Sequence, residues 1–247
     1  MLTKVEKKLP QEPVAGQPAV AANLPPYAVL FELDNVAING RKIRFQVLKA
    51  LMAQNGVELD QGMFSRFCLH SSPESNVEKL VEGLGVKKLD VAKLAAEFQK
   101  NLAEAFVSKD TVLAPGFQKF LEVARIRGVA MGALSAQSQE TVDRMAENLG
   151  LNALEVRLMV YADAKDFPRA DAWLKAAKTL SKAPRRCMAI SSSMSSCKAA
   201  LSADMYGIAV PDDFTAAQDF SGANLVVDSL ADVNGKEVLE TFCRSSR

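Results

Sequence analysis

The sequence predicts an α/β fold, in which a doubly wound parallel sheet carries an inserted all-helical segment. From Tyr27 onward, short apolar runs alternate with amphipathic stretches of helical length, a pattern typical of βαβ units. The interval between the first two expected strands breaks this rhythm, because it contains helical patterns alone and is too long for a simple crossover. These two observations predict a sheet domain with a second, helical part.

Composition narrows the class of protein. The chain has 247 residues, 49% of them hydrophobic, which is enough for one large domain or a domain with an insert. Its 30 basic and 29 acidic residues are spread along the chain, so we expect no nucleic-acid partner and no membrane partner. The four cysteines lie far apart without CxxC spacing, which argues against zinc or disulfides and favours a reducing, cytoplasmic setting. We expect neither a signal peptide nor a membrane span.

The expected elements follow the chain in order. Residues 1–25 are rich in Pro and Ala and bury too little apolar surface to offset ordering, so we expect a tail without fixed structure. Strands are expected at 27–33, 128–135, 155–161, 187–191, 205–210 and 223–228. Helices between them are expected at 115–127, 137–149, 168–180, 194–203 and 230–242. Helices of the insert are expected at 41–55, 61–67, 74–84 and 89–107.

This pattern divides the chain into two structural parts after the tail. We assign residues 26–41 and 113–247 to the α/β core and residues 42–112 to a helical cap. The cap is expected over the carboxyl ends of the strands, the edge at which open α/β sheets bind ligands.

Three stretches carry a resemblance to a known family. The segment AVLFELDNVAING resembles the first motif of the haloacid dehalogenase-like (HAD-like) superfamily, in which a strand of the type hhhhDxDxT/V presents two carboxylates. APGFQKFLEVARIRGVAMGALSAQSQETVDRMAENLGL resembles the second-motif region, and DFPRADAWLKAAKTLSKAPRRCMAISSSMSSCKAALSADMYGIAVP resembles the third and fourth. The small-cap members, such as β-phosphoglucomutase and phosphoglycolate phosphatase, are the most similar. The resemblance covers roughly residues 27–235 and implies a Rossmann-like core under a cap.

The resemblance implies phosphoryl transfer, with an Asp nucleophile, an Asp acid/base, a hydroxyl and a Lys for the phosphoryl oxygens, and Mg²⁺. Glu32 stands at the nucleophile position. Its extra methylene moves the carboxylate by about an ångström, and a misplacement of that size can cost on the order of 100-fold in rate. We therefore favour a solvated or hydrogen-bonded Glu32 at the strand end over a nucleophile. Asp34 matches the acid/base, with loop capping or binding as an equal alternative.

Ser135 matches the phosphate-binding hydroxyl. It is also expected to cap the following helix, with Gln139 reaching back, and the two roles are compatible because phosphate binds at helix N-termini. A gapless alignment puts Phe167 at the position of the third-motif Lys, so Lys165, two residues earlier, is either a phosphate ligand or an ordinary surface lysine.

The fourth motif departs most from the family. Ser191 and Ser192 occupy the positions of the acid pair that would ligate Mg²⁺, and hydroxyls replace carboxylates poorly there. We expect no metal and no cofactor. The alternative is that a loop acid is recruited as a substitute ligand, the candidates being Asp163, Asp166, Asp212 and Asp213.

A few other polar or aromatic residues could contribute to a site or to the core. Arg41, Lys42 and Arg44 follow the first motif, and we favour a solvated hinge over contact with an anionic ligand. His70 is expected at the surface or a helix end, and Trp173 in the core.

Three functional hypotheses follow. The leading one is a HAD-like protein with impaired or lost phosphatase chemistry, which binds a small anionic or polar ligand under the cap, or a protein. The alternative is an active phosphatase or phosphomutase that acts on a small phosphorylated metabolite through an atypical site, and only there is Mg²⁺ expected. The third is a scaffold or assembly subunit that engages a protein partner through residues 1–25.

Overall fold

The computed structural model describes residues 27–70, 72–86, 89–161 and 169–245. In this part of the chain six strands form one sheet in the order β3-β2-β1-β4-β5-β6. Neighbouring strands are all parallel, and the central strand β1 pairs with β2 on one side and with β4 on the other. The strands are β1 (Ala28–Glu32), β2 (Ala130–Ser135), β3 (Arg157–Val160), β4 (Cys187–Ser191), β5 (Tyr206–Ala209) and β6 (Leu225–Val226).

The order of the strands explains where a site can form. The chain builds outward from β1 through β2 to β3, and then returns to the other side of β1 to build β4, β5 and β6. The direction of winding therefore reverses between β1 and β4, and ligands of doubly wound folds bind at such a switch point. The two strands that end there carry Glu32 and Ser191 at their carboxyl ends.

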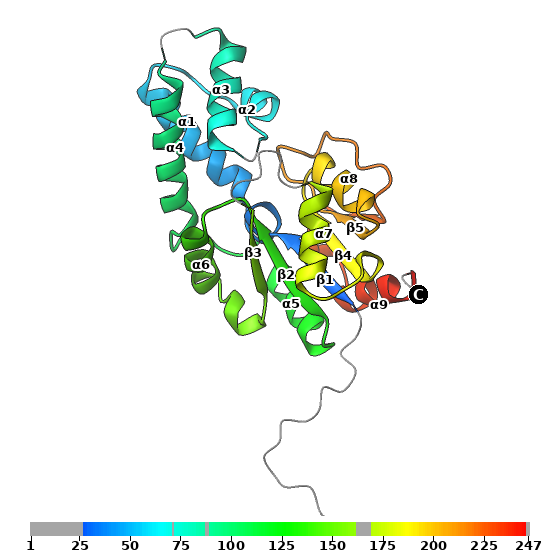
Figure 1. The fold of residues 1–247 in the computed structure, drawn as a ribbon. Coiled ribbons are helices and arrows are strands. Elements are labelled where there is room, and N and C mark those ends of the chain that lie inside the picture. The colour runs from blue at the N-terminus through cyan, green and yellow to red at the C-terminus, as the bar shows by residue number, and fades with distance from the viewer. Residues whose placement is uncertain (1–26, 71, 87–88, 162–168, 246–247) are drawn as a thin grey trace, which may run out of the picture.

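Helices cover both faces of the sheet (Figure 1). Side chains alternate along β1, so that Val29 and Phe31 belong to the larger apolar cluster and Leu30 to the smaller one. The larger cluster includes α5 (Phe117–Ile126), α6 (Gln139–Asn148) and α9 (Gly235–Ser245). The smaller one includes α7 (Ala170–Thr179) and α8 (Met194–Ser202). Trp173 is fully buried in it, which confirms its expected place in the core.

Four helices occupy the interval between β1 and α5: α1 (Gly40–Gln54), α2 (Gln61–Phe67), α3 (Pro73–Leu84) and α4 (Val91–Phe106). They form a group beyond the carboxyl ends of the strands (Figure 1). Asp60, Ser72 and Asp90 begin α2, α3 and α4 by accepting hydrogen bonds from backbone amides in the first turn. The division into a core and a cap at residues 42 and 112 remains a prediction.

The expected helix 230–242 is replaced by two elements. Residues Leu230–Asp232 form a 3-10 turn, and α9 begins only at Gly235. Gly116, with φ of +75°, packs against this turn, and a Cβ there would lie 2.3 Å from the Ala231 nitrogen. This close approach needs a glycine.

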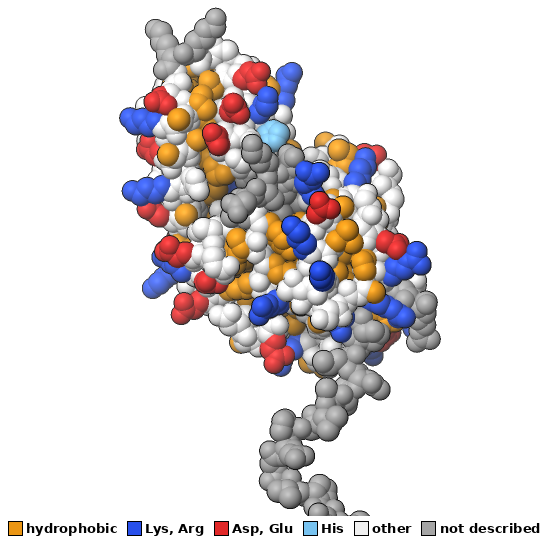
Figure 2. Space-filling view, in the orientation of Figure 1, with side chains coloured by type: hydrophobic (Ala, Val, Ile, Leu, Met, Phe, Trp, Pro, Cys, Tyr) orange, Lys and Arg blue, Asp and Glu red, His pale blue; other side chains and the backbone are white. Residues whose placement is uncertain are grey.

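Among the described residues, the surface of the molecule shows no strong segregation of charge on the face in view (Figure 2). Acidic and basic side chains are interspersed over the α1–α4 group on the face shown in Figure 2. Within the described ranges, no helix is both long and apolar enough to cross a membrane. His70 is exposed, as expected. The expected tail, Lys165 and Phe167 lie outside the described residues.

Candidate active site

The candidate site begins where β1 ends. Glu32 is the last residue of the strand, and the chain then turns through a π-helical segment, Leu33–Ala37, which carries Asp34. Both side chains are buried, with Glu32 at 0% and Asp34 at 2% relative exposure. Strand β1 lies between β2 and β4, so its carboxyl end is enclosed. The expectation that Glu32 could be solvated is therefore wrong.

Hydrogen bonds hold the Glu32 carboxylate on both oxygens. Oε1 accepts from the Ser192 backbone nitrogen at 3.3 Å. Oε2 accepts from Asn35 Nδ2 at 3.1 Å and lies 3.5 Å from the Ser192 hydroxyl. Glu32 is therefore a hydrogen-bonded group that ties the end of β1 to the turn after β4, in line with the hydrogen-bonded alternative.

Asp34 is bound to the end of the neighbouring strand. Its Oδ1 accepts a 2.6 Å hydrogen bond from the Ser135 hydroxyl, and its Oδ2 accepts from the Ala136 backbone nitrogen at 3.1 Å. Nη2 of Arg44 lies 3.7 Å from the same Oδ2. The carboxylate thus has both hydrogen-bond donors and a cation as neighbours.

Ser135 does not cap the following helix, contrary to the sequence-based expectation. Its hydroxyl donates to Asp34 and accepts from the Gln137 backbone nitrogen, because the chain runs on for three residues before α6 starts. Ser138 is the N-cap and accepts from the Thr141 nitrogen. Gln139 hydrogen-bonds Asp143 instead of reaching back.

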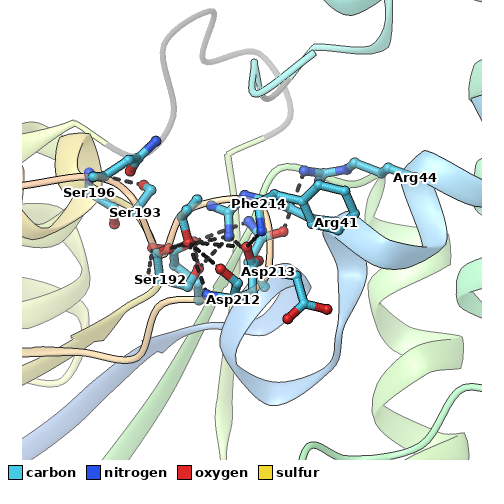
Figure 3. Close-up of polar contacts among 12 residues, drawn as sticks. Arg41, Arg44, Ser192, Ser193, Ser196, Asp212, Asp213 and Phe214 are labelled. Atoms are coloured by element: carbon cyan, nitrogen blue, oxygen red, sulfur yellow. Dashed lines mark hydrogen bonds and ion pairs between the residues drawn. The ribbon is translucent and has the colours of Figure 1, made fainter. Parts of the chain in front are cut away.

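Two arginines from the first turns of α1 enter the site (Figure 3). Arg41 and Arg44 are each only 5% exposed, so the expectation of a solvated hinge is wrong for both, whereas Lys42 between them is exposed. Residues three apart on a helix share a face, which explains why both guanidiniums point the same way. Burial lowers the pKa of Arg44, and the charge of Asp34 opposes that shift.

Arg41 bridges two loops of the core. Its Nη1 donates to Oδ2 of Asp212 at 2.7 Å and to the Ser192 hydroxyl at 2.8 Å, and it lies 3.4 Å from the Ser192 carbonyl oxygen. Thr215 fixes the Asp212 loop to the same turn, since its hydroxyl donates to the Ser192 carbonyl at 2.7 Å. The Asp212 nitrogen donates to the Thr215 hydroxyl at 3.0 Å. These contacts place Asp212 beside the serine turn (Figure 3).

The three serines after β4 have separate positions. Ser191 is the last residue of the strand and is fully buried, Ser192 is buried beside Glu32 and Arg41, and Ser193 caps α8 by accepting from the Ser196 nitrogen. The sequence therefore located the turn correctly. It gave no reason to single out Asn35 and Thr215, whose roles depend on residues far along the chain.

A cavity of about 910 Å³ lies next to this cluster and shares Asn35 and Asp212 with it. The loops after β5 and β6 form much of its wall, which includes Phe214, Phe220 and the charged Asp213. The cavity thus has both apolar and polar sides.

Comparison with known proteins agrees with this geometry. Residues 28–204 match the haloacid dehalogenase-like hydrolase family, and the chain belongs to that family. Its parallel Rossmann-like sheet is the fold of the similar solved structures. Protein CbbY of Cereibacter sphaeroides is 23% identical over 219 residues, which cover 84% of this chain and 94% of that protein. YhcW of Bacillus subtilis strain 168 is 24% identical over 208 residues, 83% and 93% of the two chains.

Solved structures show the same fold. CbbY from Rhodobacter sphaeroides in complex with phosphate superposes with a TM-score of 0.71 at 18% identity, covering 85% of this chain and 98% of that one. β-Phosphoglucomutase from Clostridium difficile gives a TM-score of 0.71 at 20% identity, covering 88% and 97%.

Mg²⁺, which the family implies, does not fit the described residues. Ser191 and Ser192, which the resemblance to the family predicts at the metal-ligand positions, offer hydroxyls, whereas Mg²⁺ prefers carboxylate and water oxygens. Asp212, one of the expected substitutes, is paired with Arg41. In the described part of the chain, no group of three or more His, Cys, Asp or Glu side chains could hold a metal ion. Asp163 and Asp166 lie outside that part.

Proposed function

We propose that this chain is a HAD-like protein whose phosphoryl-transfer chemistry has been lost and whose fold now binds a ligand or a protein. The state of Glu32 carries the proposal. Its side chain is fully buried, and hydrogen bonds from the Ser192 nitrogen and from Asn35 Nδ2 fix both of its oxygens, which supports a structural role over nucleophilic attack.

The other groups expected to take part in phosphoryl transfer bind one another. The Ser135 hydroxyl, which would contact a phosphoryl oxygen, donates instead to Asp34. Asp34, which would move a proton, also accepts from the Ala136 nitrogen. This arrangement supports a structural role for the pair at the ends of β1 and β2.

Charge also disfavours a phosphate at this place. A phosphate oxygen at 4–5 Å from Glu32 or Asp34 would meet a repulsion of about 1–4 kcal/mol for each pair of like charges. Arg41 cannot offset this cost fully, because its guanidinium already pairs with Asp212 at 2.7 Å. The site is therefore better suited to a small polar or weakly charged molecule than to a phosphomonoester.

The binding part of the proposal is supported by the cavity beside the cluster. Its volume of about 910 Å³ falls within the usual range for small-molecule sites, and its wall combines apolar and polar side chains. Residues 1–25 are a second candidate for binding, in this case of a protein. Deletion of those residues, followed by light scattering and partner capture, tests the tail separately.

An active phosphatase or phosphomutase is the second candidate function, and family membership favours it. The structure also brings Glu32, Asp34 and Ser135 to one edge of the sheet. Under this alternative, Glu32 or Asp34 would act with a rebuilt metal site on a small phosphorylated metabolite.

Hydrolysis assays distinguish the two candidates. The purified full-length chain is incubated with p-nitrophenyl phosphate and with a sugar phosphate, with Mg²⁺ or with EDTA, beside a Glu32→Ala variant purified in parallel. We expect the wild type and Glu32→Ala to release phosphate at the same background rate. Mg²⁺-dependent release that disappears in Glu32→Ala would overturn the proposal. Release that persists in that variant is measured again in Glu32→Ala/Asp34→Ala: its disappearance there would also overturn the proposal, and its persistence identifies a contaminating phosphatase.

A further inference from the structure

The Arg41 guanidinium lies among oxygens of Asp212 and Ser192. We infer that it stands in place of a dissociable divalent cation there, so that Mg²⁺ is not needed to neutralise the Asp212 carboxylate. This inference goes beyond the proposed function, because it concerns the charge balance of the site and not its activity.

Three oxygens converge on one nitrogen of Arg41. Nη1 lies 2.7 Å from Oδ2 of Asp212, 2.8 Å from the Ser192 hydroxyl and 3.4 Å from the Ser192 carbonyl oxygen. Oε2 of Glu32 lies 3.5 Å from that hydroxyl, so Ser192 stands between Glu32 and Arg41. A point surrounded by carboxylate, hydroxyl and carbonyl oxygens is one that a cation stabilises.

The Arg41 guanidinium is covalently part of the chain, so it cannot dissociate from the site as a bound metal ion could. It extends from the first turn of α1, and the residue is only 5% exposed, so the ion pair with Asp212 is weakly screened by salt. Thr215 holds the carboxylate partner in place through its bond to the Ser192 carbonyl. A divalent ion would have to displace this side chain before it could reach the same oxygens.

Arg44 supplies a second fixed charge close by. Its Nη2 lies 3.7 Å from Oδ2 of Asp34, and its Nη1 lies 3.5 Å from Oδ1 of Asn35. Two guanidiniums, Arg41 and Arg44, thus face the carboxylates of the site, and together they carry the same formal charge as one Mg²⁺. Each guanidinium neutralises one carboxylate, Arg41 that of Asp212 and Arg44 that of Asp34.

Thermal unfolding of the full-length chain tests the inference. The wild type, Arg41→Ala and Lys42→Ala are compared at constant ionic strength, with and without about 10 mM Mg²⁺ or Mn²⁺. Lys42→Ala is the matched control, because it removes the same charge from the adjacent, exposed position. Removal of the Arg41 side chain leaves the oxygens of Asp212, Ser192 and Glu32 without their cation.

We expect the midpoints of the wild type and Lys42→Ala to move by less than about 1 °C on addition of a divalent ion. Arg41→Ala should unfold at a lower temperature, and the ion should raise its midpoint by about 3 °C or more. A wild-type shift as large as this, or an Arg41→Ala variant that does not respond, would overturn the inference.

Two further measurements apply if Arg41→Ala does not fold. The double variant Arg41→Ala/Asp212→Asn removes both charges of the pair, and we expect it to fold and to show no divalent response. Paramagnetic resonance of Mn²⁺ added to the wild type requires no variant: we expect no saturable binding, and saturable binding would overturn the inference. Hydrolysis by the wild type without any metal would refute the proposed function and leave this inference intact.

Discussion

The Ser135 hydroxyl donates a 2.6 Å hydrogen bond to Oδ1 of Asp34, so the carboxyl ends of β2 and β1 are joined by two buried side chains. The register places Glu32 opposite Leu134, one residue before Ser135, which brings the serine alongside the turn that carries Asp34. The same hydroxyl accepts from Gln137, and Asp34 also accepts from Ala136. The turn after β1 and the turn after β2 are thereby fixed to each other.

Substitution Ser135→Ala should destabilise the chain. It removes one donor to a buried carboxylate, and an unsatisfied buried group costs about 1–3 kcal/mol. Urea unfolding measures the loss, with Ser202→Ala as the control, since Ser202 is exposed and its replacement should change stability by less than about 0.5 kcal/mol. Equal effects of the two substitutions would show that the hydrogen bond contributes nothing.

Arg44 and Asp34 should show energetic coupling. Arg44→Met leaves Asp34 without its nearby cation, and Asp34→Asn removes the charge that needs it. We expect Arg44→Met to destabilise the chain and the double variant to recover part of the loss, with a coupling energy of about 0.5–3 kcal/mol. Strictly additive losses in urea unfolding would contradict direct coupling between the two residues.

Stability should fall at alkaline pH because of two buried thiols. Burial raises the pKa of Cys68 and of Cys187 from 9.0 to about 12. A raised pKa in the folded state means that the contribution is fully present below pH 9 and is lost between pH 9 and about pH 12, because only the unfolded chain ionises in that window.

Urea unfolding at pH 8 and pH 10 measures this effect. We expect each thiol to contribute a loss of about 1 kcal/mol at pH 10. The variant Cys68→Ala/Cys187→Ala is the control, and its stability should change less between the two values of pH. A wild-type profile parallel to that of the variant would rule out the thiols as the cause.

Restoring the family residues should restore activity only when Arg41 is also removed. The variant Glu32→Asp/Ser191→Glu/Ser192→Asp retains Arg41, whose guanidinium would pair with the introduced carboxylate, and we expect it to stay inactive. With Arg41→Ala added, Mg²⁺-dependent hydrolysis of p-nitrophenyl phosphate should appear. The matched variant that keeps Glu32 should be about 100-fold slower, because its carboxylate is displaced by about an ångström. Equal activity with and without Arg41 would show that Arg41 does not compete with the metal.

Much of the fold could be predicted from the sequence, because apolar periodicity is a local signal. Strand β4 and helix α2 begin and end where they were expected, at Cys187–Ser191 and Gln61–Phe67. The other strands are shorter than predicted. The break before α9 was missed, and the turn that precedes this helix packs against Gly116, more than a hundred residues earlier in the chain.

The candidate site could be located but not described from the sequence. The positions of Glu32, Asp34 and Ser135 followed from the resemblance to the HAD-like family, and the structure brings them to one edge. Burial of Arg41 could not be predicted, because its partners come from loops that only the folded sheet brings near α1. In the sequence, the spacing of three residues along a predicted helix was the one indication that Arg41 and Arg44 lie on the same face.

The Arg41–Asp212 contact also has a consequence for the folding kinetics of the chain. The two residues are 171 positions apart in the sequence, so the contact closes a long loop, and we expect it to form late in folding. Interactions that form after the transition state slow unfolding and do not affect the rate of folding. We therefore expect Arg41→Ala to accelerate unfolding in stopped-flow denaturant jumps while the refolding rate stays near that of the wild type. The partly buried ion pair would thus lengthen the lifetime of the native state without changing how fast the chain reaches it.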